Sequence, residues 1–188
     1  MSLFKIPILL TGAFFILKAL TPPHVSSQAE RRPPTLVGRY VSTLVKFMRI
    51  AHALSCLCET ILIVSYHNPD IPIARVALST LSRPLSNGAG GIGFSTSFLV
   101  GSALAIAGAQ LRLACYRALG SLFTFEMSIR NSHKLVTDGP YRYVRHPAYS
   151  GLIMTMLGEA VIQFGRGSWL RECGWMETVG RSDEADVE

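Results

Sequence analysis

Apolar runs of nearly membrane-spanning length alternate with polar segments along this chain of 188 residues. A helix needs about 20 consecutive apolar residues to cross the hydrocarbon core of a bilayer. The pattern therefore predicts an all-α fold, a polytopic membrane helical bundle of about four transmembrane helices. We divide the chain into a first transmembrane helix (1–20), a Pro-rich basic linker (21–49), a second transmembrane helix (50–66), a loop (67–91), a third transmembrane helix (92–113), a stretch that ends in a fourth apolar helix (114–165) and a polar tail expected to be disordered (166–188).

The first apolar run admits two interpretations. Lys5 and Lys18 stand near its ends, where lysine side chains can reach the membrane interface while their stems stay in the hydrocarbon. A basic start followed by an apolar stretch is also typical of a secretory signal peptide. No A-x-A-like cleavage site follows and further apolar runs come later, so we expect a retained helix.

The composition supports a membrane protein. Only 16% of the residues are charged and the mean hydropathy is +0.33, whereas a soluble domain usually carries about 25% charged residues. The net charge of +6 is scattered between apolar runs, so we attribute it to membrane topology and contacts with the lipid bilayer and expect no nucleic acid partner. The four cysteines form no CxxC pair, so we expect neither a disulfide framework nor a metal site.

Two of the apolar runs carry residues with specific implications. Gly101, Ala105 and Gly108 fall on one face of the third run, and small residues allow close helix packing in lipid. Glu59 lies within the second run, and an acid at membrane depth must face protein or water. Either a buried interhelical contact or a ligand contact would satisfy this requirement.

The distribution of basic residues predicts an orientation. Segments 19–49 and 112–147 are rich in Lys and Arg, whereas 67–91 contains only Arg75 and Arg83. Because cytoplasmic segments carry the excess of positive charge, the two basic segments are expected in the cytosol. With four spans, 112–147 is then a cytosolic ligand-binding loop and the C-terminus lies in the lumen.

The stretch 133–151, HKLVTDGPYRYVRHPAYSG, has an unusual density of aromatic and basic residues. Tyrosine rings can stack on a purine or lie against a cation, and histidine can donate to ribose or carboxylate oxygens. A helix beginning near Pro147 would leave N–H groups free to meet a ligand carboxylate. The alternative is an interfacial belt of Tyr, Arg and His that only anchors a helix.

The pattern LVT-x-GPY-x(3)-RHPxYxG in this stretch closely resembles the membrane isoprenylcysteine carboxyl methyltransferase family. The small-residue run before it, with Leu119-Gly120 and Leu122-Phe123-Thr124, also fits the family, and the resemblance covers roughly 92–164. It implies S-adenosylmethionine as methyl donor and the C-terminal prenylcysteine carboxylate of a CaaX-processed protein as substrate. It also implies a multi-pass protein of the endoplasmic reticulum membrane.

The resemblance carries site residues over by position. The candidate donor-binding residues are His133, Lys134, Leu135, Val136, Tyr141, His146, Pro147, Ala148 and Tyr149. Glu126 stands where the family has a polar donor contact, although the residue type differs. Arg145 and His146 are the candidate catalytic residues, with a basic clamp such as Arg145 fixing the substrate carboxylate.

The chain departs from the family after this helix. The family continues with a returning span and a cytosolic segment that carries an Arg and paired glutamates, and nothing here matches that segment. Other possibilities therefore stay open: a phospholipid methyltransferase using the same donor, an NADPH-dependent sterol reductase with a related RHP-x-Y element, or a non-catalytic truncated membrane protein.

Overall fold

The described part of the protein, in a computed structural model, consists of helices and the segments that connect them. It comprises residues 3–21, 36–83, 89–120, 123 and 136–176, and no strand occurs among them. The elements are α1 (Lys5–Ala19), α2 (Leu36–His67), α3 (Pro72–Leu81), η2 (Ala89–Gly91), α4 (Thr96–Leu119), η4 (Gly139–Arg142), α5 (Pro147–Phe164) and α6 (Trp169–Glu172). The all-α prediction is confirmed for these residues.

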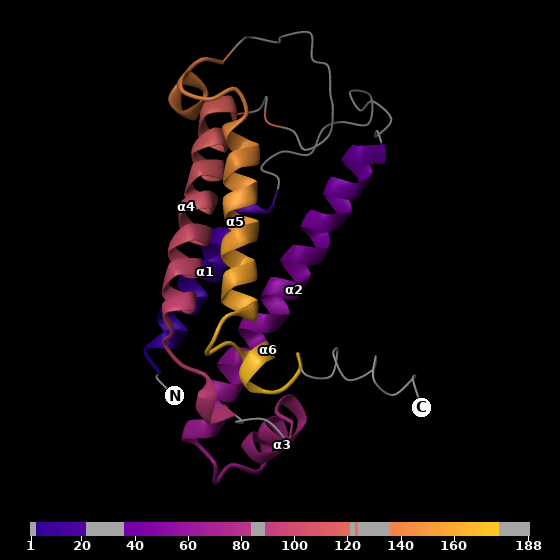
Figure 1. The fold of residues 1–188 in the computed structure, drawn as a ribbon, viewed down its shortest axis with the longest axis vertical. Helices are drawn as coiled ribbons and strands as arrows, with labels where there is room; N and C mark the ends of the chain where they lie inside the picture. Colours follow the sequence, from indigo (N-terminus) through magenta and orange to yellow (C-terminus); the bar gives the residue numbers. More distant parts are fainter. Residues whose placement is uncertain (1–2, 22–35, 84–88, 121–122, 124–135, 177–188) are drawn as a thin grey trace, which may run out of the picture.

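The helices form an elongated bundle (Figure 1). α4 and α5 run side by side, α1 packs against α4, and α2 leans away from α5 toward one end. α3 and α6 lie at the opposite end of the bundle, below α4 and α5 in Figure 1. The first turn of α5 and the last turn of α4 are therefore at one end, and the C-terminal helix is at the other.

Within the described residues, two helices are long and apolar enough to cross a membrane, Gly38–His67 and Thr96–Leu119. The sequence predicted about four spans, and the other two apolar runs form the shorter helices α1 and α5. α1 has 15 residues, which at 1.5 Å per residue is about 22 Å and shorter than a bilayer core of about 30 Å. α5 has 18 residues, with Glu159 and Gln163 among them.

Several predicted boundaries differ from the structure. The expected linker 21–49 gives way to α2 at Leu36, because no proline follows Pro34 to stop a helix there. The expected loop 67–91 contains α3, whose first residue Pro72 suits the first helical position. The tail expected to be disordered forms α6, where the Ser168 side chain caps the helix by accepting from the Arg171 N–H. Residues 177–188 lie outside the described part.

Glycines hold α4 and α5 in close antiparallel contact. A Cβ atom on Gly108 would lie 2.6 Å from the Thr155 backbone N, and one on Gly158 would lie 2.5 Å from the Ala105 backbone N. A Cβ on Gly101 would lie 2.9 Å from the carbonyl oxygen of Gly158. The prediction that the small-residue face allows close helix packing is confirmed.

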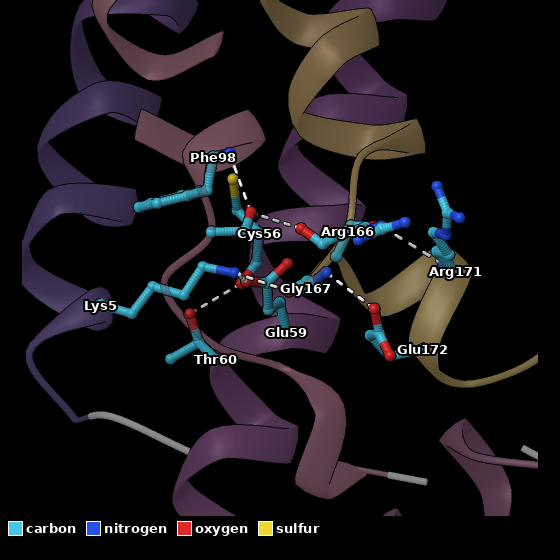
Figure 2. A network of polar contacts seen from close by, with 11 residues as sticks. Lys5, Cys56, Glu59, Thr60, Phe98, Arg166, Gly167, Arg171 and Glu172 are labelled. Carbon is cyan, nitrogen blue, oxygen red and sulfur yellow. Dashed lines mark hydrogen bonds and ion pairs between the residues drawn. The ribbon is translucent and has the colours of Figure 1, made fainter. Parts of the chain in front are cut away.

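Two buried ion pairs join α2 to its neighbours. Lys5 Nζ lies 2.5 Å from Glu59 Oε1, and His52 Nδ1 lies 2.5 Å from Glu159 Oε2. Lys5 also donates to the carbonyl of Gly167 at 2.9 Å, as Figure 2 shows. Glu59 therefore makes the interhelical contact rather than the ligand contact, and α1 is an integral part of the bundle.

A second group of hydrogen bonds, two of them from tryptophan side chains, holds the segment around α6 at its end of the bundle. The Gly167 N–H donates to Glu172 Oε1 at 2.8 Å (Figure 2), and the indole N–H groups of Trp169 and Trp175 both donate to the carbonyl of Leu81. These contacts attach the C-terminal segment to α3. They explain why this segment is ordered despite its polar sequence.

Candidate functional site

The candidate site lies where the polypeptide turns from η4 into α5. Gly139 adopts a left-handed φ of 60°, which glycine tolerates without strain, and Pro140 follows it in η4. Pro147 is the first residue of α5, with His146 at the N-cap. The prediction that a helix begins near Pro147 is confirmed.

Tyr141 is the most enclosed aromatic residue of this turn. It is half-buried, and the Cys115 thiol on α4 is close enough to affect its titration. Burial raises the pKa of Tyr141, and the neighbouring thiol raises it further. The phenol is therefore neutral at physiological pH and is available as a hydrogen-bonding group rather than as a base.

The polar candidates are exposed. Arg145 and His146 are exposed, and Tyr149 is 62% exposed. The rings of His146 and Tyr149 lie edge to face, with their centroids 6.2 Å apart. The structure therefore brings an imidazole and a phenol together on the outside of one helix start, and the exposed Arg145 directly precedes His146 in the sequence.

The remaining candidates have other positions. Pro147 is buried, whereas Val136 and Ala148 are half-buried, so these three belong to the framework of the turn. The residues Glu126, His133, Lys134 and Leu135 lie outside the described part of the chain.

The start of α5 is suited to an anionic group. The side chain of the N-cap residue His146 makes no hydrogen bond to the first turn of α5. Pro147 has no N–H, and the amides of Tyr149 and Ser150 donate to the carbonyl of His146, so the helix dipole, which places partial positive charge at this end, is the main attraction for an anion. Together with the exposed Arg145, this end of α5 can receive a carboxylate, such as that of an amino acid ligand.

Arg112 is a residue of this region that the sequence indicated only as a topology signal. It is 3% exposed, and its Nη1 donates to the carbonyl of Ala148 at 3.2 Å. Its Nε donates to the carbonyl of Ala19 at 3.0 Å. An arginine inside an apolar run, four residues before Tyr116, was the signal that could have identified it.

Among the described residues, no group of three or more His, Cys, Asp or Glu side chains could hold a metal ion.

A cavity of about 20 Å³ lies away from this turn, between α1, α2, α4 and α5, with His52, Glu59 and Ser102 in its wall. Its volume suits a single water molecule. It is separate from the turn before α5.

The sequence matches known proteins over the segment that contains this site. Residues 101–168 match the model of the isoprenylcysteine carboxyl methyltransferase family. Protein-S-isoprenylcysteine O-methyltransferase B of Arabidopsis thaliana is 39% identical over 64 residues, which is 33% of this chain and 32% of that protein. The probable protein-S-isoprenylcysteine O-methyltransferases of Oryza sativa subsp. indica and subsp. japonica are each 37% identical over 65 residues, 34% of either chain.

The match is limited in extent. The chain spans about a third of the length of the curated relatives it matches. No solved structure matches it. The resemblance inferred from the motif is nevertheless confirmed by two kinds of comparison: residues 101–168, which include most of α4, the turn at η4 and α5, are similar to the isoprenylcysteine carboxyl methyltransferase family.

Proposed function

We propose that this chain transfers a methyl group from S-adenosylmethionine to the C-terminal carboxylate of a prenylated cysteine in a CaaX-processed protein. The observation that carries the proposal is the family match over 101–168, together with relatives named as protein-S-isoprenylcysteine O-methyltransferases. The exposed polar residues of the same segment, at the start of α5, agree with a ligand site.

The residues of this turn fit the donor. S-adenosylmethionine, when bound, supplies an electrophilic methyl group on a sulfonium centre. The start of α5 and Arg145 offer partial and full positive charge to its carboxylate. His146 and Tyr149 offer ring N–H, hydroxyl and aromatic faces to its ribose and adenine. Tyr141, Pro147 and Ala148 shape the turn that presents these groups.

The reaction needs little acid–base chemistry from the protein. The substrate carboxylate is ionised at neutral pH, since an α-carboxyl group has a pKa of about 3.3–3.7, and it is already a nucleophile. The chain must hold that carboxylate in line with the methyl group and keep water out. Correct positioning alone can supply about 7–11 kcal/mol in well-oriented systems. We assign Arg145 and His146 to this orientation.

The proposed membrane arrangement follows the hydropathy and the charge. α2 and α4 are the two strongest spans, and we propose that α1 and α5 cross with them to give four spans. The turn before α5 then faces the cytosol, where CaaX-processed substrates are found, and the membrane is that of the endoplasmic reticulum. The exposed apolar side chains of α5, such as Ile153 and Leu157, would meet lipid acyl chains or the prenyl group.

The test is methyl transfer from labelled S-adenosylmethionine to a small farnesylcysteine acceptor, in membranes that contain only this chain. Transfer above background establishes the activity. Donor binding without transfer indicates a half-site that needs a partner or a segment found in the relatives outside the matched region. Absence of donor binding excludes the methyltransferases and leaves the sterol reductase or a non-catalytic protein.

The variant His146→Ala sharpens this test. We expect it to abolish donor binding, because the imidazole is exposed at the N-cap and contacts Tyr149. His67→Ala is the matched control, since His67 is an exposed histidine at the end of α2. Unchanged donor binding in His146→Ala would remove His146 from the site.

A further inference from the structure

The buried side chain of Arg112 connects three helices at the end of the bundle that carries the candidate site. It lies on α4, is 3% exposed, and reaches α1 and α5 through its guanidinium. The Nε atom donates to the carbonyl of Ala19 at 3.0 Å, the Nη1 atom to the carbonyl of Ala148 at 3.2 Å, and the Nη2 atom to the hydroxyl of Tyr116 at 2.9 Å. The Tyr116 hydroxyl in turn donates to Ala19.

The two backbone acceptors of Arg112 lie at the ends of two different helices. Ala19 is the last residue of α1, so its carbonyl belongs to the helix end that carries partial negative charge and lacks intrahelical donors. Ala148 is the second residue of α5 and follows directly after Pro147. Arg112 therefore ties the end of α1 to the first turn of α5. An arginine within an apolar bundle is costly unless its donors are satisfied, and here three are.

The aliphatic part of Arg112 is also fitted to α5. A Cβ atom on Gly151 would lie 2.9 Å from Arg112 Cγ and 2.8 Å from the carbonyl oxygen of Gly108. The glycine at this position thus leaves room for the arginine stem to pass beside the α5 backbone. Both the stem and the guanidinium fix the position of the first turns of α5.

We propose that Arg112 is a positioning residue for the candidate donor site. It touches neither donor nor substrate and acts through Ala148, which is followed by the exposed Tyr149 and lies two residues after the exposed His146. The expected effect of Arg112 on donor binding and turnover rests on the proposed function. Its structural part, the ordering of the first turn of α5 by Arg112, is independent of that function.

The test compares three variants of the full chain in detergent or nanodiscs. Arg112→Gln removes the three-way fork. Arg112→Lys keeps the charge but not the fork, because lysine offers a single flexible ammonium. Arg117→Gln is the matched control, since Arg117 is an exposed arginine on the same helix.

Hydrogen–deuterium exchange measures the structural part. We expect Arg112→Gln to raise exchange at the amides of Tyr149 and Ser150, which bond to the carbonyl of His146, with the centre of α4 unchanged. We expect Arg117→Gln to leave both regions unchanged. Unaltered exchange at the start of α5 in a folded Arg112→Gln chain would overturn the proposal, and so would a uniform rise along α1, α4 and α5.

Donor affinity and kinetics measure the functional part. We expect Arg112→Gln to raise the donor Kd and KM and to lower kcat/KM by about 10–100-fold, as a displaced site does, and Arg112→Lys to restore part of the loss. If the wild-type chain binds no donor, the proposed function fails while the exchange result still decides the role of Arg112. If Arg112→Gln does not fold, Tyr116→Phe is the second variant, because it removes only the hydroxyl group that accepts from Arg112 Nη2 and donates to the carbonyl of Ala19. Unchanged exchange at the start of α5 in that variant would then count against the proposal.

Discussion

Replacing Lys5 by methionine should destabilise the bundle far more than its position near the N-terminus suggests. Lys5 is 1% exposed, its ammonium lies 2.5 Å from Glu59 Oε1, and it donates to the carbonyl of Gly167 at 2.9 Å. The ammonium also lies 4.4 Å from the centroid of the Phe98 ring. The substitution keeps the apolar stem but leaves the Glu59 carboxylate buried without its cation.

The structure sets the magnitude. Removing one partner of a buried ion pair costs about 3–5 kcal/mol, because the remaining charge is uncompensated. At about 2–4 °C per kcal/mol for a chain of this size, the melting temperature should fall by roughly 6–20 °C. The double variant Lys5→Met/Glu59→Gln should lose less than Lys5→Met alone, since it buries no unpaired charge.

The assay is thermal or denaturant unfolding of the purified chain in one detergent. Lys18→Met is the matched control, because Lys18 is an exposed lysine on the same helix, and its loss should be within about 0.5 kcal/mol. The reasoning is refuted if Lys5→Met and Lys18→Met unfold within about 1 kcal/mol of each other. It is also refuted if the double variant is less stable than Lys5→Met.

Three further predictions follow from the packing. Gly158→Ala should destabilise the chain by about 1–3 kcal/mol or more in the same unfolding assay, because the new Cβ would lie 2.5 Å from the backbone N of Ala105 on α4. Gly93→Ala is the control and should leave the stability unchanged, because a Cβ at Gly93 would meet no atom within 4 Å. Glu159→Gln should weaken the contact between α2 and α5 by removing the charge opposite His52; increased exchange of α2 relative to α4 would show it, and equal exchange would contradict it. Burial and nearby carboxylates raise the pKa of Cys173 from 9.0 to about 11, so the Cys173 thiol of the folded chain should resist iodoacetamide at pH 8. Its contribution to stability should be complete below pH 9 and should be lost as the pH rises toward 11. Rapid alkylation of Cys173 itself in the folded chain at pH 8 would count against this.

The local features were predictable because they depend on residues close in sequence. The small-residue face of α4 was visible from the seven-residue spacing of Gly101 and Gly108, and the structure confirms it. The start of α5 followed from Pro147, since proline suits the first helical position and cannot continue an earlier helix. The all-helical class followed from the length and hydropathy of the apolar runs.

The boundaries of α2 and α3 were mispredicted because hydropathy is a poor guide to where a helix ends. Lys46, Arg49 and His52 interrupt the apolar pattern, yet they lie within one continuous helix of 32 residues. Their polarity does not oppose helix formation, since lysine and arginine are good helix formers. An apolar run and a helix do not have to begin and end at the same residues, and only the backbone structure shows where the helix begins and ends.

By itself the sequence determined the helical class and the family motif, since a motif is a local property of the chain, and the residues of the donor site remain a proposal that rests on that motif. The tertiary structure decided the partners of the buried charges. Glu59 pairs with Lys5 across 54 positions of sequence, and Arg112 reaches both Ala19 and Ala148. Such pairings depend on which helix faces meet and on the low dielectric between them, where an unpaired charge is too costly to remain. No local pattern encodes that choice. The place of Arg112 inside an apolar run marks it as unusual, but its contacts with Ala19 and Ala148 could be recognised only once the helices were in place.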